Sequence, residues 1–251
     1  MKGDTLPEVR AAGIDGDADA GNHDHDHPGQ TLEGVAPVLG LYYRALSGRK
    51  TALLPYGDGN SEQYSDTHTA IRLPERMRRF FSGDDNFIWY KIALTHRAAH
   101  YEGGTFAFSF LRPAKHFAAL RPSTMDAVPR HARASDLEVF FSLFAQRKLA
   151  IDVFTVMEDL RLDEWAKRRY CGLRGAYQKI QRAALDERPS LSALGPRNAL
   201  AEVMVRISLA SEQTFSLPAL LHEPARQLMQ VMRPLLHQDA CVEDSAEAAM
   251  R

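Results

Sequence analysis

Apolar positions recur at helical spacing through most of the chain. In residues 85–102, Trp89 and Ile92 share one helical face with His96 and His100, because residues three, four and seven apart lie on the same side of an α-helix. The same spacing predicts further helices over residues 35–47, 135–146, 149–170, 198–211 and 218–236. The pattern therefore predicts an all-α or mainly α fold.

Extended structure is predicted only in short pieces. Residues 51–56 read as a short extended segment, and the turn-rich residues 56–69 as a loop or short strands. Residues 105–111 (TFAFSFL) alternate between larger and smaller side chains, which fits a strand, although a buried helix fits them too. We expect a multi-helix domain with a short extended segment or hairpin.

Composition divides the chain into three parts. Residues 1–33 are rich in Asp, Gly and Ala and are predicted to be a disordered tail, because they offer too little apolar surface to fold. The HDHDH run at residues 23–27 either binds a transition metal loosely or is incidental to a solvated tail. Residues 34–236 form the predicted helical domain, and residues 237–251 a C-terminal tail.

The bulk properties exclude several functions. A formal charge of −1 over 251 residues provides no general attraction to nucleic acid, and no apolar stretch is long enough to predict direct membrane insertion. The two cysteines lack CxxC spacing, which fits a reducing compartment, and the first residues do not resemble a signal peptide. We therefore expect a cytoplasmic protein.

Two histidines and one acid are the strongest candidates for a site. His96 and His100 lie on an apolar helical face, and Glu158 lies on the apolar face of the helix predicted over residues 149–170. Buried imidazoles and carboxylates need partners, so these side chains should meet one another or share a metal ion. We expect Zn²⁺ or another divalent metal there, with Glu202 as a weaker fourth ligand. No other cofactor is indicated.

The pattern departs from that of zinc peptidases. In those enzymes a Glu follows the first His and acts as the general base, whereas this chain has Arg97, which cannot accept a proton. We therefore assign no catalytic residue. Two interpretations of these residues stay open: a zincin-like metal-binding protein, with or without hydrolytic activity, and a helical scaffold in which His96, His100 and Glu158 satisfy one another without metal.

Charged residues beside Glu158 are candidates for binding a partner. Asp159 and Asp163 share one side of the predicted helix, and Arg161 lies between them in the chain. Such a stripe forms ion pairs with neighbouring Arg residues, docks a basic partner protein or assists in binding a metal ion. We expect Asp159, Arg161 and Asp163 to contribute to a docking surface if one exists here.

Two motifs resemble a known group of proteins. They are H-x-x-x-H-x-x-x-G-T-[FY], from His96 to Phe106, and V-x-E-D-x-R-x-D, from Val156 to Asp163. Together with DERPSLSALGPRNALAEVMVRISL, they resemble the region that precedes the von Willebrand A domain in the CbbO and NorD group. The resemblance covers roughly residues 85–236.

The resemblance implies an adaptor without turnover of its own. Proteins of that group accompany MoxR-type AAA+ ATPases and act on a client, either Rubisco or a nitric oxide reductase. The DxSxS signature of their von Willebrand A domain does not occur in this chain, so client binding through that domain is not expected. The leading expectation is an accessory module for a MoxR-type ATPase in activation or maturation of a client metalloenzyme or Rubisco.

Overall fold

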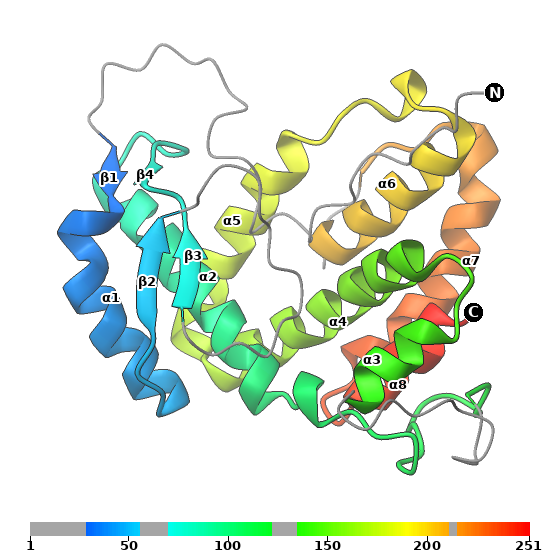
Figure 1. Cartoon of the computed structure of the whole chain (residues 1–251). Coiled ribbons are helices and arrows are strands. Elements are labelled where there is room, and N and C mark those ends of the chain that lie inside the picture. The colour runs from blue at the N-terminus through cyan, green and yellow to red at the C-terminus, as the bar shows by residue number, and fades with distance from the viewer. Residues whose placement is uncertain (1–28, 56–69, 122–134, 211–214) are drawn as a thin grey trace.

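The computed structural model describes residues 29–55, 70–121, 135–210 and 215–251. Within these residues the chain forms eight α-helices and two sheets of two strands each (Figure 1). The prediction of a mainly α, multi-helix domain is confirmed. The predictions for the first 28 residues of the tail and for the loop at 56–69 lie outside the described residues.

The N-terminal part combines two helices with the short strands. Its elements are β1 (Gln30–Thr31), α1 (Leu32–Ser47), β2 (Ala52–Pro55), β3 (Ala70–Leu73), β4 (Arg76–Met77) and α2 (Gly83–Glu102). β1 pairs antiparallel with β4, and β2 pairs parallel with β3. The side chains of Leu39, Trp89 and Leu94 are fully buried between α1 and α2, and this packing fixes the inner face of α2.

The C-terminal part is almost entirely helical. Its α-helices are α3 (Asp136–Ser142), α4 (Arg147–Arg169), α5 (Arg174–Asp186), α6 (Pro196–Ala210), α7 (His222–Met232) and α8 (Val242–Ala249). Short 3-10 turns join them at Thr105–Ala107, Cys171–Leu173, Leu191–Ala193, Ala219–Leu221 and Arg233–Leu236. α3 begins with a capping box between Ser135 and Glu138, which satisfies helix N–H groups that have no partner within the helix.

Residues 105–111 form no strand. They make one 3-10 turn and then continue without regular structure. The aromatic side chains of Phe108 and Phe110 are nevertheless buried, and both pack against Phe140 of α3. Burial of two residues at i and i+2 produces the alternating pattern without any strand pairing.

α4 is the central element of the molecule. It packs against α2, α5, α6 and α8 (Figure 1). Phe154, Val156 and Leu162 on different sides of this helix are all fully buried, and each belongs to a different apolar cluster. The polar residues in the middle of α4, from Asp152 to Asp163, are therefore enclosed by neighbouring helices.

The predicted C-terminal tail at 237–251 is wrong in its second half, where α8 is a buried helix. Val242 and Ala246 pack in the core, and Asp244 and Glu247 are fully buried. These carboxylates are buried at low cost because they accept hydrogen bonds from backbone N–H groups of residues 115–121. α8 is therefore part of the domain.

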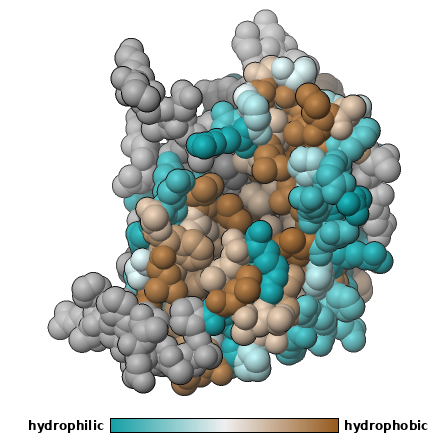
Figure 2. Space-filling view, turned by 90° about the vertical axis from the view of Figure 1, so that its right-hand side faces the viewer, coloured by the Kyte–Doolittle hydropathy of each residue, from teal (hydrophilic) through white to brown (hydrophobic). Residues whose placement is uncertain are grey.

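The described surface includes a broad apolar area. Figure 2 shows it on the side that lies to the right in Figure 1, where apolar residues gather between polar margins. Among the exposed large apolar side chains of the molecule, Leu220 precedes α7 and Met229 lies on it. None of the described helices is long and apolar enough to cross a membrane.

Candidate metal centre

His96 and His100 face α4 from the buried side of α2. They lie one helical turn apart, and their relative exposures are 8% and 5%. The two Nε2 atoms are 3.3 Å apart, and the rings meet edge to face at a centroid distance of 4.9 Å. The helical spacing thus brings the two imidazoles together at one point between the helices, as the sequence predicts.

Asp159 of α4 completes this group. Its Oδ1 lies 3.3 Å from Nε2 of His96 and 3.8 Å from Nε2 of His100. Zn²⁺ in proteins has bonds of about 2.1 Å to nitrogen and oxygen in a tetrahedral arrangement, which places neighbouring ligand atoms about 3.4 Å apart. The three observed separations are close to that value, so the three atoms can bind one metal ion with small adjustments.

The other nitrogen of each histidine has a partner of its own. Nδ1 of His96 lies 2.8 Å from Oδ1 of Asp163, and Nδ1 of His100 lies 3.1 Å from the hydroxyl of Thr105. The Thr105 hydroxyl donates to Oε1 of Glu158 at 2.5 Å, so its oxygen accepts from Nδ1–H of His100. Asp163, as a carboxylate, accepts from Nδ1–H of His96. Both Nε2 atoms are thereby left to bind a cation at the centre.

A hydrogen-bonded chain extends this arrangement into α5. Oδ2 of Asp163 accepts a hydrogen bond from Nε2 of Gln181 at 2.9 Å, and Oε1 of Gln181 accepts one from Nζ of Lys167 at 3.1 Å. Asp163, Gln181 and Lys167 are all buried. The orientation of the His96 ring is therefore fixed by residues from two helices.

The electrostatics of the group require a positive charge. Burial lowers the pKa of His96, but Asp163 and Asp159 outweigh burial and raise that pKa to about 10. Burial, together with the neighbouring His96, Arg97 and Arg161, holds the pKa of His100 well below its usual value. Without metal, a proton on His96 supplies the positive charge beside the two carboxylates; a bound divalent ion would take the place of that proton.

Glu158 does not take the ligand position predicted for it. It is fully buried, but Nε and Nη2 of Arg161 donate to its carboxylate at 2.8 Å and 2.5 Å. Burial raises the pKa of Glu158, and Arg161 and Thr105 more than compensate, so its pKa lies below the usual value. Glu158 supports the centre indirectly, through Thr105 and His100.

Two further predictions are corrected by burial and pairing. Asp159, Arg161 and Asp163 are each only 3% exposed, so they lie inside the domain and form no docking surface. Glu202 is held by Arg188 and Arg206 and is not among the side chains that converge on the histidines.

Sequence reasoning missed Thr105 as a support; it placed Asp159 only in a stripe that could assist a metal, and it chose Glu158 as the ligand. One residue along an α-helix turns the side chain by 100°, and only the position of α2 shows which of Glu158 and Asp159 faces the imidazoles. Thr105 lies directly after Gly104, whose φ of 82° is a left-handed conformation that glycine adopts without strain. That turn brings the Thr105 hydroxyl back to His100.

The surroundings disfavour hydrolysis by the zinc peptidase route. Arg97 stands where those enzymes have a general base, and Glu158 is engaged by Arg161 and Thr105. The arrangement thus provides ligands and supports for a cation without a carboxylate in the usual position to activate water.

No known sequence family, curated protein or solved structure matches this chain.

Proposed function

We propose that the protein binds one divalent transition metal ion, of the Zn²⁺ type, between α2 and α4. The ligands are Nε2 of His96, Nε2 of His100 and Oδ1 of Asp159. The observation that carries the proposal is the convergence of these three buried atoms, at separations of 3.3, 3.3 and 3.8 Å.

Supporting residues favour a metal ion over a proton at this centre. In metal sites each ligating histidine donates its second N–H to a carboxylate or another oxygen, which fixes the ring and its tautomer. Here Asp163 and Thr105 occupy these two places. If the centre held only a proton on His96, one acceptor beside that ring would be enough. The site instead brings together two imidazoles and a carboxylate, which are ligands that Zn²⁺ prefers.

The proposed role of the ion is structural. It joins α2, which packs on the N-terminal elements, to α4, which contacts most of the C-terminal helices. A tetrahedral ion with three protein ligands keeps one further position for water or another small ligand. Because Arg97 replaces the usual base, we propose no hydrolytic turnover.

A second candidate function follows from the motifs that carry the family resemblance. Every fixed polar residue of those motifs contributes to this one centre: His96, His100 and Asp159 as ligands, and Thr105, Glu158, Arg161 and Asp163 as supports. This agreement supports an accessory module of the CbbO and NorD type. We propose a MoxR-type AAA+ ATPase as its partner, with a Rubisco or metalloenzyme client.

Metal analysis of two neighbouring variants tests the metal proposal. Both are made in full-length protein that carries His23→Ala, His25→Ala and His27→Ala, so that the HDHDH run does not contribute. Asp159→Asn keeps the shape of the side chain but removes the ligand charge, and should weaken Zn²⁺ binding by at least about 100-fold. Glu158→Gln should lower stability but weaken Zn²⁺ binding much less than Asp159→Asn does, because Glu158 acts only through Thr105 and is not a ligand. Equal Zn²⁺ affinity in Asp159→Asn and in the parent protein, which carries only the three His→Ala changes, would contradict the proposal.

Cobalt substitution gives an independent readout. A tetrahedral Co²⁺ site with two imidazoles and a carboxylate absorbs visible light much more strongly than hydrated Co²⁺, so the band should appear in wild type and in Glu158→Gln. It should be missing in Asp159→Asn.

The adaptor proposal is tested separately, by co-purification with a MoxR-type ATPase in the presence and absence of ATP. If the two proteins associate in neither state, the adaptor proposal is wrong.

A further inference from the structure

A second group of metal-binding side chains lies at the surface, apart from α2. It consists of His116, His237 and Asp239, whose ligand atoms all lie within 4.8 Å of one another. Nε2 of His116 is 3.0 Å from Oδ1 of Asp239. The rings of His116 and His237 are stacked at a centroid distance of 4.5 Å, with 27° between their planes. His237 and Asp239 are exposed, and His116 is half-buried.

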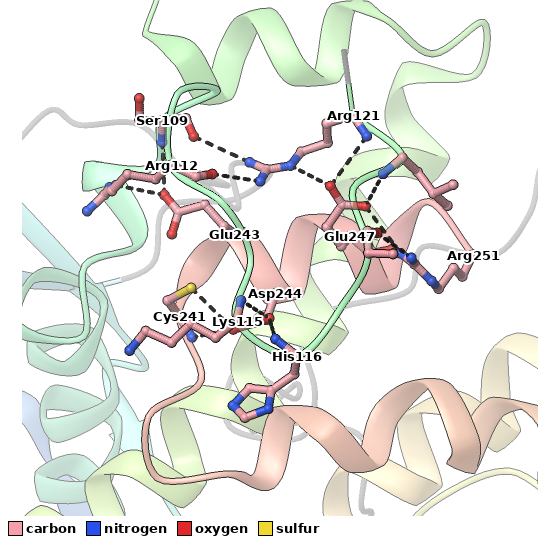
Figure 3. Close-up of polar contacts among 12 residues, drawn as sticks. Ser109, Arg112, Lys115, His116, Arg121, Cys241, Glu243, Asp244, Glu247 and Arg251 are labelled. Carbon is pink, nitrogen blue, oxygen red and sulfur yellow. Dashed lines mark hydrogen bonds and ion pairs between the residues drawn. The ribbon is translucent and has the colours of Figure 1, made fainter. Parts of the chain in front are cut away.

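The backbone at His116 is fixed by α8. The N–H groups of Lys115 and His116 both donate to Oδ1 of Asp244, at 2.9 Å and 2.7 Å (Figure 3). Asp244 is fully buried and also accepts from the N–H of Cys241. A carboxylate with several amide donors is a rigid anchor, so the His116 ring is presented from a fixed position.

His237 and Asp239 are positioned by a tight turn. The N–H of His237 bonds to the carbonyl oxygen of Pro234, and the N–H of Ala240 bonds to that of His237, both at 3.2 Å. The Nζ of Lys115 donates to the carbonyl oxygen of Asp239 at 2.7 Å. The turn thus lies directly beside the segment that carries His116, and both segments are held by backbone contacts.

We propose that His116, His237 and Asp239 form a surface site that binds a divalent transition metal reversibly. Two imidazoles and a carboxylate suit Zn²⁺, Ni²⁺ and Cu²⁺, whereas Mg²⁺ and Ca²⁺ prefer oxygen ligands alone. Metal ligands need separations of about 3.4 Å, which exposed side chains reach by rotating about their own bonds. The remaining coordination positions face solvent and accept water or a small anion.

Metal bound there would join two segments that are far apart in sequence. His116 belongs to the irregular segment that runs past α8, and His237 and Asp239 belong to the turn that leads into α8. The ion would therefore clamp both segments around the start of α8. A ligand that binds only the folded state raises its stability, so added metal should raise the melting temperature through this site.

Zn²⁺ and Ni²⁺ titrations by calorimetry test the site in the full-length His23→Ala, His25→Ala, His27→Ala background. The parent protein, which carries only these three changes, should show two classes of metal-binding site: a tight one at the buried centre and a weaker one at the surface. His237→Ala and Asp239→Asn should each weaken the second class by at least about tenfold, and both should fold, because these side chains are exposed. His222→Ala is the matched control: its ring is also exposed, and within the described part of the chain it bonds to the carbonyl oxygen of Leu217 alone.

The buried site and the surface site can be tested independently of each other. Asp159→Asn should remove the tight class and leave the weaker one, whereas His237→Ala should do the reverse. In NMR spectra of the imidazole nitrogens, Zn²⁺ beyond the first equivalent should shift the signals of His116 and His237 and leave that of His222 in place. A weaker class that is identical in wild type and His237→Ala, or unshifted His116 and His237 signals, would overturn the surface site.

Discussion

Glu158 and Asp159 are neighbours in the chain and have different roles. Glu158 turns toward Arg161 and Thr105, while Asp159 turns toward the two imidazoles. The apolar stripe around Glu158 predicts its burial correctly, because the side chain is fully buried. Its charge is neutralised within its own helix, however, and a helical wheel does not show which of two adjacent acids faces the neighbouring helix.

Asp163 is predicted to set the metal affinity without touching the ion. Asp163 accepts from both the His96 Nδ1–H and the Gln181 amide, whereas an asparagine at this position would offer only one acceptor oxygen. Asp163→Asn therefore loses one of these two hydrogen bonds, and the His96 ring is no longer fixed as before. Loss of such a support lowers metal affinity by about 10–100-fold. Competition with a chelating Zn²⁺ indicator measures the change. Asp186→Asn, an exposed position at the end of α5, is the control and should bind Zn²⁺ as wild type does.

A side chain at Gly103 is predicted to lower the stability of the folded protein. A Cβ there would lie 2.7 Å from the carbonyl oxygen of Ala99 and closer still to Leu162. Gly103→Ala should therefore lower the free energy of unfolding by about 1–3 kcal/mol, measured by urea denaturation. Gly40→Ala in α1, where a Cβ would meet nothing within 4 Å, should raise it by about 0.5–1 kcal/mol. Equal effects of the two changes would contradict the packing around Gly103.

At the scale of elements, the helices with an apolar stripe are predictable and α8 is not. The periodicity predicts a helix at residues 149–170, and α4 spans Arg147–Arg169. α8 is short, and half of its residues are polar. Its carboxylates are buried because an irregular segment more than a hundred residues earlier supplies N–H donors, and no local pattern encodes that contact.

Glu247 of α8 is predicted to make stability depend on pH. Burial raises the pKa of Glu247, but hydrogen bonds from Arg121, from the N–H groups of Leu120 and Arg121, and from Arg251 outweigh burial and lower it. A carboxyl whose pKa is depressed on folding stabilises the protein above its unfolded pKa, about 4.3. That contribution disappears as the pH falls through the lower, folded value.

Glu247→Gln tests this dependence. It should lower the free energy of unfolding by about 1–3 kcal/mol at pH 7, because Arg121 loses its buried partner. The difference from wild type should shrink steadily as the pH falls below about 4.3. Urea denaturation at several pH values provides the measurement, and a difference that stays constant down to about pH 3 would show that Glu247 is not the titrating group.

At the scale of the whole molecule, α4 contributes to three of the four apolar clusters in the described part of the chain, and α8 packs against it. Helical periodicity is sufficient to predict the mainly α class, since it depends only on local spacing. The relative placement of α2, α4 and α8 depends on contacts between distant segments, and these contacts decide which polar residues converge. The adaptor role suggested by the motif resemblance stays a prediction.

Removal of residues 241–251 is predicted to affect the entire domain. The truncation leaves Arg121 without Glu247 and opens the side of α4 that α8 covers. Loss of one partner from a buried ion pair costs about 3–5 kcal/mol, so the truncated protein should melt at a much lower temperature by circular dichroism. Leu220→Ser, at a side chain that is 91% exposed, should leave the melting temperature nearly unchanged.

Arg161 connects the buried centre to the entry of α8. Its guanidinium donates to the carbonyl oxygens of Gly103 and Ala240 and to the carboxylate of Glu158. A mechanical pull on the C-terminal segment would withdraw the Ala240 acceptor first and then disturb the Glu158 pair. Thr105 would transmit that disturbance to His100, so force applied at the C-terminal segment would speed the release of an ion from the proposed centre.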